Sequence, residues 1–269
     1  MTKIIVLGKG LLGSHIEQLY KVPVIPHSEC DITQPFDIDA VLRHHQPNVV
    51  INCAGIVSQS PTAADTLRLF KVNSQGPRLL QAACDEIDCR LIQISTDCVF
   101  SGSRGNYCEI DIPNSNTLYG ISKYLGEITE YPHLTIRTSF VGYPDPYNRA
   151  LLGWAAQQPK IVGYDNYLWN GVTTVELARM LFDVIIPRKL SNILHLHSQV
   201  AISKYEMLQT AKEVFGWNYE IVPESTQQPN EMWHVANMTL TSEMPDMCVQ
   251  KSFRQMLEEM KGALANAGS

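Results

Sequence analysis

Lys3-Ile4-Ile5-Val6-Leu7-Gly8-Lys9-Gly10-Leu11-Leu12-Gly13 is the stretch of this sequence that decides the fold. It opens with a short apolar run rich in β-branched side chains, which favours a strand. A helical pattern then continues from the last glycine to Tyr20. The motif Gly-x-Gly-x-x-Gly, placed between a strand and a helix, is typical of dinucleotide-binding proteins.

Each glycine of the motif has an expected task. Gly8 permits the tight turn, Gly10 lets a pyrophosphate approach the backbone, and Gly13 packs the helix closely on the strand. The phosphates are expected at the positive end of the helix that begins near Leu11. The predicted loop contacts with the dinucleotide are Gly8, Lys9, Gly10, Leu11, Leu12 and Gly13. The alternative is a glycine-rich turn without a ligand.

Strand and helix patterns alternate through the first half of the chain. Val22–Ile25, Asn48–Asn52 and Arg90–Ser95 are predicted strands, with helical patterns between them. This alternation predicts an α/β fold, a Rossmann-like doubly wound parallel sheet. Ligands of such sheets bind beyond the carboxyl ends of the strands. Four further residues are therefore expected to line one crevice with the glycine loop: Cys53, Ala54, Gly55 and Ser95.

The end of the second predicted strand should contact the adenosine ribose. An acidic residue there favours NAD, whereas a 2′-phosphate needs donors or positive charge. The chain has Pro26-His27-Ser28 at this place. We therefore favour NADP(H) over NAD(H), with Lys9, His27 and Ser28 as candidate phosphate contacts. The alternative is that His27 and Ser28 are loop residues without a ligand.

Tyr119-Gly120-Ile121-Ser122-Lys123 is the predicted catalytic segment. In a helix over Tyr119–Tyr131, Tyr119 and Lys123 lie one turn apart on the same face. An ammonium beside a phenol favours the phenolate, so Lys123 is expected to lower the Tyr119 pKa from about 10 towards neutrality. Tyr119 is then a proton donor and acceptor at physiological pH. The alternative is a surface tyrosine beside a solvated lysine.

Composition narrows the class of protein. The chain has 269 residues, 45% apolar and 18% charged, which is typical of soluble globular proteins. A net charge of -6 gives no electrostatic reason to expect nucleic acid as a partner. No apolar run approaches the roughly 20 residues of a membrane span, and no signal-peptide pattern is present. Seven cysteines without a Cys-x-x-Cys pair favour the cytoplasm, and we expect no metal site.

Five motifs occur in the order of the extended short-chain dehydrogenase/reductase superfamily. They are Gly8-x-Gly10-x-x-Gly13, Asn52-Cys53-Ala54-Gly55, Asn73, Ser95-Thr96-Asp97 and Tyr119-x-x-x-Lys123. The segments Gln93–Phe100 and Arg137–Val141 resemble those of dTDP-4-dehydrorhamnose reductases, enzymes of deoxysugar and polysaccharide biosynthesis. The resemblance covers roughly the first 140 residues well, and five linked motifs are more specific than any one of them.

The resemblance implies an oxidoreductase and a role for each motif residue. Tyr119 would protonate a ketone oxygen, and the Thr96 hydroxyl would orient the carbonyl. Lys123 would hold the Tyr119 pKa down and hydrogen-bond the nicotinamide ribose. Asp31 and Ile32 would flank the adenine. Cys53, Ala54 and Asn73 would line the cofactor crevice, although Asn73 lies between two predicted helices and is equally well interpreted as a helix cap.

Position 98 departs from the pattern of these reductases. Cys98 stands where they have tyrosine, and it aligns with a catalytic cysteine of GDP-fucose synthases, which epimerise before reducing. That family uses a partner histidine, and none occurs between Arg137 and Asn192. An inert buried Cys98 is the favoured interpretation. Related dehydratases have glutamate at this position, so the sequence does not favour dehydration.

The second half has a looser pattern after a turn-rich break. We predict a nucleotide-binding domain over 1–141 and a substrate-binding domain over 142–269, parts of which return to the sheet. The aromatic segment Tyr164–Trp169 and the following Asn170–Thr173 are candidates for substrate contacts, with core packing as the alternative. The expected partner is a nucleotide-sugar, and a homodimer is compatible with the sequence.

The leading hypothesis is an NADP(H)-dependent reductase of a 4-keto sugar nucleotide, of the dTDP-4-keto-6-deoxyhexose type. A second hypothesis is an epimerase-reductase of a GDP- or UDP-linked sugar that uses Cys98. A third is a non-catalytic, nucleotide-binding regulatory subunit on the same scaffold. The presence of Thr96, Tyr119 and Lys123 favours chemistry, because a binding module has no need of a tyrosine with a lowered pKa.

Overall fold

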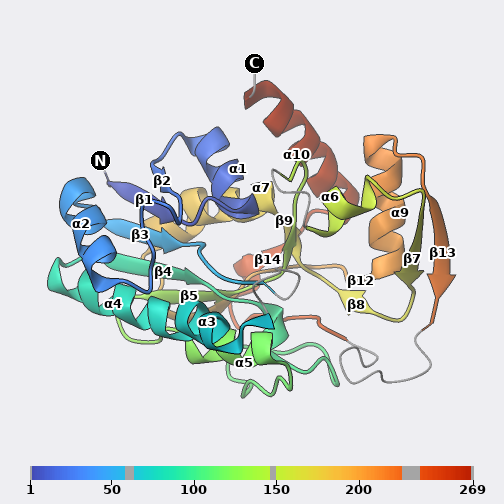
Figure 1. Cartoon of the computed structure of the whole chain (residues 1–269). Coiled ribbons are helices and arrows are strands. Elements are labelled where there is room, and N and C mark those ends of the chain that lie inside the picture. Colours follow the sequence, from blue (N-terminus) through green and yellow to red (C-terminus); the bar gives the residue numbers. More distant parts are fainter. Residues whose placement is uncertain (1, 58–63, 146–149, 226–236, 268–269) are drawn as a thin grey trace.

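A six-stranded parallel sheet forms the centre of the molecule (Figure 1). The computed structural model describes residues 2–57, 64–145, 150–225 and 237–267. In spatial order the strands are β2 (Val24–Ile25), β1 (Ile4–Leu7), β3 (Val49–Asn52), β4 (Arg90–Ile94), β5 (Leu134–Arg137) and β10 (Asn192–His195). All neighbouring pairs are parallel, as the alternation of strands and helices predicts.

The two faces of the sheet are covered by different helices. The strands alternate their side chains, so that Val6 and Ile51 point to one face and Ile5 and Val50 to the other. Against the first face pack α1 (Leu11–Tyr20), α7 (Thr174–Arg179) and α10 (Phe253–Ala267); against the second pack α2 (Pro35–His45) and α4 (Gly76–Glu86). The fold is therefore the predicted doubly wound, Rossmann-like α/β sheet.

The direction of the strand order reverses between β1 and β3. The chain passes from β1 outward to β2, then returns to pair β3 on the other side of β1. Leu7 and Asn52 are register partners at the carboxyl ends of the two strands. Ligands of open α/β sheets bind in the crevice at such a reversal, so the segments after Leu7 and Asn52 define the candidate site.

Two predicted helices differ from the structure. Asn73 was expected between helices, but α3 (Thr66–Phe70), the π-helical turn η2 (Lys71–Gln75) and α4 follow one another without a break. The helix predicted over Tyr119–Tyr131 is α5 (Leu118–Leu125) and ends at Gly126. A side chain at Gly126 would lie 1.9 Å from the Asn73 carbonyl oxygen, so close packing on η2 accompanies the end of α5.

The second half contributes both to a separate lobe and to the sheet. The lobe on the right of Figure 1 contains α6 (Leu151–Ala155), β7 (Lys160–Tyr164), α9 (Lys204–Phe215) and β13 (Glu220–Glu224), with β7 and β13 parallel. In contrast, β10 pairs with β5 and α10 packs on the sheet. The domain boundary between 141 and 142 stays a prediction.

Short elements connect these parts. The two-stranded pairs are β6 (Phe140–Val141) with β9 (Val172–Thr173), β8 (Leu168–Trp169) with β12 (Ile202–Ser203), and β11 (His197–Ser198) with β14 (Cys248–Val249). The remaining helical turns are η3 (Asp97–Val99), η4 (Met180–Ile185), α8 (Ile186–Arg188) and η5 (Pro245–Met247).

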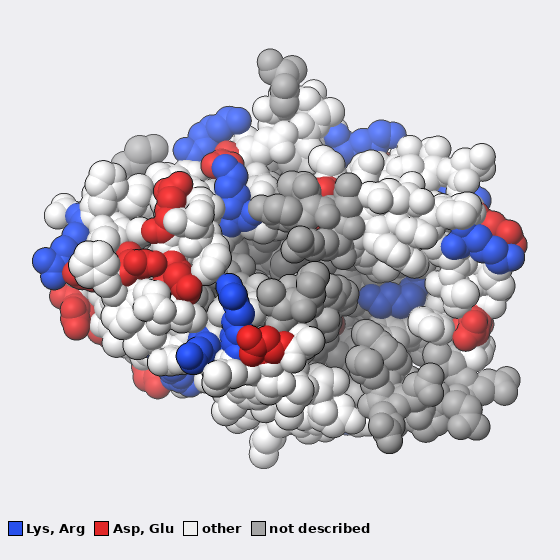
Figure 2. Space-filling view, viewed as in Figure 1, with Lys and Arg blue, Asp and Glu red and all other residues white. Residues whose placement is uncertain are grey.

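The surface carries charges of both signs. Figure 2 shows acidic and basic side chains interspersed over the face it presents. Across the described parts of the chain, no helix combines the length and the apolar character that crossing a membrane requires.

Candidate active site

The glycine loop joins β1 to α1 in the predicted strand–turn–helix context. Gly8 has a φ of +96°, and a side chain there would lie 2.6 Å from the Ala54 backbone nitrogen. A side chain at Gly13 would lie 2.1 Å from the Gly8 carbonyl oxygen. At Gly10 the same position has, among the residues that the structure describes and apart from the adjoining chain, no atom within 4 Å. The loop therefore packs tightly against the segment after β3 and leaves its Gly10 side open, at the N-terminus of α1.

Asn73 connects the segment after β3 to α5. Its Oδ1 accepts a hydrogen bond from the Ile56 N–H at 2.8 Å, and its Nδ2 donates to the Ile56 carbonyl at 2.8 Å and to Ser122 Oγ at 3.1 Å. Asn73 lies inside η2 and is only 1% exposed, so the interpretation as a helix cap is wrong. It holds Ile56 and Ser122 in place, and this indicates an indirect role in the crevice.

Lys123 extends from α5 under the carboxyl end of β4. Its Nζ donates a hydrogen bond to the Ile94 carbonyl at 2.7 Å, and a side chain on Gly55 would lie 3.8 Å from the same Nζ. Burial lowers the Lys123 pKa to about 8, against the opposing charges of Glu127 and Cys53. The ammonium is therefore at the crevice defined by Gly8 and Ala54.

Tyr119 stands half-buried at the start of the same helix, and its hydroxyl is within the influence of the Thr96 side chain. Burial raises the Tyr119 pKa, Cys98 and Asp97 raise it further, and the Thr96 side chain opposes them. The expectation that Lys123 lowers the Tyr119 pKa towards neutrality is wrong for the chain by itself, because loss of solvent is the larger effect. Tyr119 consequently keeps its proton at neutral pH.

Thr96, Asp97 and Cys98 form a compact turn where β4 ends. Thr96 caps η3 by accepting a hydrogen bond from the Cys98 N–H at 3.1 Å, and its hydroxyl donates to Asp97 Oδ1 at 3.0 Å. The Cys98 thiol donates to the same oxygen at 3.4 Å. Burial and the Asp97 carboxylate both raise the Cys98 pKa, so the thiol is held in its protonated form.

Ser95 supports the site from behind. Its hydroxyl donates to Glu127 Oε1 at 2.8 Å, and Glu127 forms a buried ion pair with Arg137 at 2.7 Å. Both members of that pair are 4% exposed. The Ser95 side chain is thus committed to a structural network, so only its backbone remains for the predicted cofactor contact.

A family model described as the RmlD substrate binding domain matches residues 1–267. The chain belongs to this family. Among its relatives, the dTDP-4-dehydrorhamnose reductase of Streptomyces griseus is 32% identical over 126 residues, which are 45% of this chain and 41% of that protein. The enzyme of the same name from Mycobacterium tuberculosis is 25% identical over 232 residues, 80% of this chain and 76% of the relative.

Solved structures share the fold of this RmlD-family chain. The dTDP-4-dehydrorhamnose reductase of Bacillus anthracis in complex with NADP superimposes with a TM-score of 0.81 at 21% identity, covering 97% of this chain and 98% of that one. The UDP-glucose 4-epimerase of Thermotoga maritima with UDP-glucose reaches a TM-score of 0.76 at 17% identity, covering 99% of each chain. Because both identities are below 25%, these similarities show that the folds are alike and nothing about activity.

The predicted adenosine end of the RmlD-family crevice lies after β2. Exposed His27 places its Nε2 at 3.9 Å from Asp31 Oδ2. Burial opposes ionisation of Asp31, yet hydrogen bonds from Thr33 and the positive charges of His27 and Arg68 keep its pKa below the ordinary value. Arg68 is a nearby cation that the sequence interpretation missed, because it lies in α3, far along the chain from β2.

The remaining predicted cofactor residues differ in their surroundings. Ser28 is exposed on the same turn as His27, whereas Lys9 forms an ion pair with Glu17 at 2.8 Å. Ile32 is 3% exposed and packs in the core beneath Gly76, and its place beside the adenine stays a prediction. Leu11 and Leu12 begin α1, with Leu12 buried in the core.

Two side chains from the second half join the RmlD-family site. Tyr167, from the predicted aromatic segment, has its pKa raised by burial and by Cys98 and Asp97. Lys204, which the sequence interpretation missed, has its pKa lowered by burial and raised by the same two groups. Trp169 and Asn170 are in the core instead, with Asn170 bonded to Leu240 at 2.8 and 2.9 Å.

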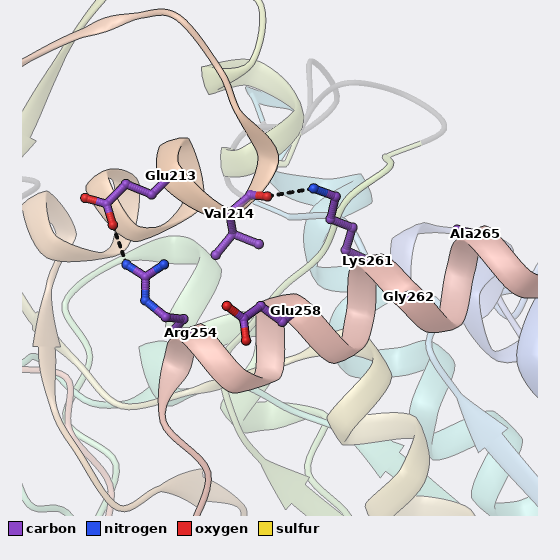
Figure 3. A pocket seen from close by; sticks show the side chains of 7 residues that line it. All are labelled: Glu213, Val214, Arg254, Glu258, Lys261, Gly262 and Ala265. Carbon is purple, nitrogen blue, oxygen red and sulfur yellow. Dashed lines mark hydrogen bonds and ion pairs between the residues drawn. The ribbon is translucent and has the colours of Figure 1, made fainter.

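The pocket of about 600 Å³ shown in Figure 3 lies elsewhere, between α9 and α10. Three of its charged side chains are bonded: Arg254 pairs with Glu213, and Lys261 donates to the Val214 carbonyl at 2.8 Å. None of the seven lining residues belongs to the predicted site. Within the described residues, no cluster of three metal-ligating side chains is present either.

Proposed function

We propose that this RmlD-family chain is an NADP(H)-dependent reductase of a 4-keto sugar nucleotide, of the dTDP-4-keto-6-deoxyhexose type. The observation that carries the proposal is the meeting of three side chains at one crevice. The start of α5 packs on the Thr96 turn, where a side chain at Gly120 would lie 2.1 Å from the Cys98 carbonyl oxygen, and Tyr119 and Lys123 lie one turn apart on α5. The names of the relatives from Streptomyces griseus and Mycobacterium tuberculosis support the substrate class.

The residues of the crevice fit a dinucleotide. The open side of Gly10 at the N-terminus of α1 suits a pyrophosphate, since backbone N–H groups and the helix dipole favour an anion there. A bound nicotinamide in its reduced form supplies a hydride. Cys53, Ala54 and Gly55 provide a flat wall of small residues beside the loop, and the Lys123 ammonium stands next to Gly55.

Three side chains divide the proton chemistry. Tyr119 donates its phenolic proton to the ketone oxygen, and its raised pKa means that the proton is present at neutral pH. Thr96 acts on the Tyr119 hydroxyl and orients the carbonyl. Lys123, with a pKa of about 8, is mostly protonated at neutral pH and favours the phenolate that remains after the proton has left.

Preference for NADP(H) rests on the turn after β2. His27 and Ser28 are exposed there, and Arg68 acts electrostatically on the same turn through Asp31. Donors and positive charge favour a 2′-phosphate over a ribose hydroxyl. The dissociation constants of NADPH and NADH, compared by fluorescence titration, test the preference, and tighter binding of NADH would contradict it.

The decisive experiment is consumption of NADPH with a dTDP-4-keto-6-deoxyhexose, epimerised at carbons 3 and 5, as the substrate. Tyr119→Phe should bind NADPH as the wild type does and turn over at least about 100-fold more slowly, as expected for loss of a general acid. Tyr124→Phe is the matched control, since Tyr124 is in the same helix and 42% exposed. Oxidation of NADPH at an equal rate by Tyr119→Phe would refute the role of Tyr119.

The two other hypotheses lack a supporting contact. An epimerase role needs Cys98 to exchange protons, but its thiol donates to Asp97 and its pKa is raised. A regulatory subunit has no use for Thr96 and Tyr119 at one crevice. Binding of NADPH without its consumption by any nucleoside-diphosphate keto-sugar would overturn the reductase proposal and favour the regulatory one.

A further inference from the structure

Lys204 has a backbone position that is firmly set. It is the first residue of α9 and follows the N-cap Ser203. Ser203 and Glu206 form a capping box: the Ser203 hydroxyl accepts a hydrogen bond from the Glu206 N–H at 3.1 Å, and the Glu206 carboxylate accepts one from the Ser203 N–H at 2.7 Å. The Lys204 N–H donates to the Tyr167 carbonyl at 3.1 Å, and β12 pairs with β8 just beside it. Lys204 and Tyr167 are thus held together by backbone contacts.

The Lys204 side chain turns inward over two aromatic rings. Its Nζ lies 5.1 Å from the centroid of Tyr167 and 5.8 Å from that of Trp169. A cation in the first turn of a twelve-residue helix opposes the helix dipole, and burial disfavours its charge further. Both the helix dipole and the loss of solvent make a charged lysine at this position unfavourable. Residues that are locally unfavourable in this way are typical of functional sites.

The inward ammonium shares its surroundings with the catalytic residues. Asp97 and Cys98 act electrostatically on Lys204, and the same two groups act on Tyr119 and on Tyr167. Asp97 also accepts the hydroxyl hydrogen of Thr96. The tertiary fold therefore brings a donor from the second half within electrostatic reach of the Asp97 carboxylate, which also acts on Tyr119.

Building on the proposed function, we propose that Lys204 binds the sugar ring of the nucleotide-sugar and helps to determine which sugar the site accepts. A sugar hydroxyl donates and accepts hydrogen bonds at once, so it matches a site in which the Lys204 ammonium donates and the Asp97 carboxylate accepts. A diphosphate does not match, because the same carboxylate repels it. The ring of Tyr167 adds an apolar surface next to the ammonium.

Binding measurements separate the sugar from the nucleotide. In the NADP⁺-loaded protein, calorimetry gives the dissociation constants of dTDP and dTDP-glucose, a stable sugar nucleotide, for the wild type and Lys204→Met. The wild type should bind dTDP-glucose more tightly than dTDP. Lys204→Met should lose roughly 10- to 100-fold of affinity for dTDP-glucose, the range of a hydrogen bond to a charged group, and keep its affinity for dTDP.

The control is Lys212→Met, in the same helix, where the ammonium lies 5.9 Å from the Tyr219 ring. It should leave both constants unchanged. Lys204→Met should be at least as resistant to thermal unfolding as the wild type, because it removes a partly buried cation from the positive end of α9; if it fails to fold, Lys204→Gln replaces it.

Three outcomes contradict the inference. Unchanged affinities in the Lys204 variant, equal losses for dTDP and dTDP-glucose, or a wild type that binds both ligands equally would each exclude Lys204 as a sugar contact. Failure of the proposed function is distinguishable from these: the wild type would then bind NADPH but neither dTDP nor dTDP-glucose.

Discussion

Replacing Lys123 by methionine should change how the stability of this protein depends on pH. The Lys123 side chain is 8% exposed, and burial lowers its pKa from 10.5 to about 8. Between these two pH values the native state has released the lysine proton while the unfolded chain still holds it. Stability rises with pH wherever the unfolded state binds more protons, so the wild type should gain stability over this window.

The size of the effect follows from the difference of the two pKa values. A shift from 10.5 to about 8, at about 1.4 kcal/mol per pKa unit, corresponds to about 3 kcal/mol. Below pH 8 the wild type carries this penalty in full. The free energy of unfolding of the wild type minus that of Lys123→Met should therefore be constant below pH 8 and increase by about 1.4 kcal/mol per pH unit above it.

Urea unfolding followed by tryptophan fluorescence, from pH 6.5 to pH 10, measures this difference. Lys123→Gln is the matched control: it retains a donor for the Ile94 carbonyl, which Lys123 bonds at 2.7 Å, and lacks the charge. Both variants should give the same slope against the wild type and differ only in a constant, which reflects the retained or lost hydrogen bond. A difference that stays flat, or falls, between pH 8 and pH 10 would refute the assignment of a lowered pKa to Lys123.

Three further predictions concern the scaffold of the site. Gly13→Ala would place a methyl group 2.1 Å from a backbone oxygen of the loop. Fluorescence titration should therefore show NADPH binding at least about tenfold more weakly to this variant. The control Gly262→Ala, where a methyl group meets no atom within 4 Å in the described part of the chain apart from the adjoining turns of its own helix, should bind NADPH as the wild type does. Glu127→Ala leaves the Arg137 charge buried and unpaired, and urea unfolding should show a loss of about 3–5 kcal/mol, against a smaller loss for Glu127→Gln. Cys98→Ser should reduce the substrate at close to the wild-type rate and should incorporate as much solvent deuterium at carbons 3 and 5 as the wild type does. A large fall in the reduction rate or in deuterium incorporation would support the epimerase hypothesis.

Several features of the fold follow from short-range rules that a single sequence carries. The strand–turn–helix at the N-terminus depends on the positive φ of Gly8 and on the absence of side chains at Gly8 and Gly13. These requirements are local, so the motif itself predicts them. The alternation of strands and helices likewise predicts the parallel sheet, and β1, α1 and β3 lie within a residue or two of the predicted bounds.

Other features depend on contacts between distant segments. The helical spacing of Tyr119 and Lys123 is a property of the sequence, but the Tyr119 pKa is raised by burial and by Cys98 and Asp97. Asn73 has the composition of a helix cap, yet its partners are Ile56 and Ser122. In each case the side chain interacts with residues that are far away along the chain, and the periodicity of the sequence does not predict these contacts.

The sequence by itself determined the conformation of the glycine loop and the class of fold, because glycine geometry and hydrophobic periodicity act over a few residues. It also predicts the catalytic segment. Only the tertiary structure decided the environment of that segment. It buried Lys123 and half-buried Tyr119, brought Asp97 within electrostatic reach of both Tyr119 and Lys204, and positioned Lys204 over Tyr167. Loss of solvent and electrostatic interaction depend on distance in space, which the order of residues along the chain does not specify.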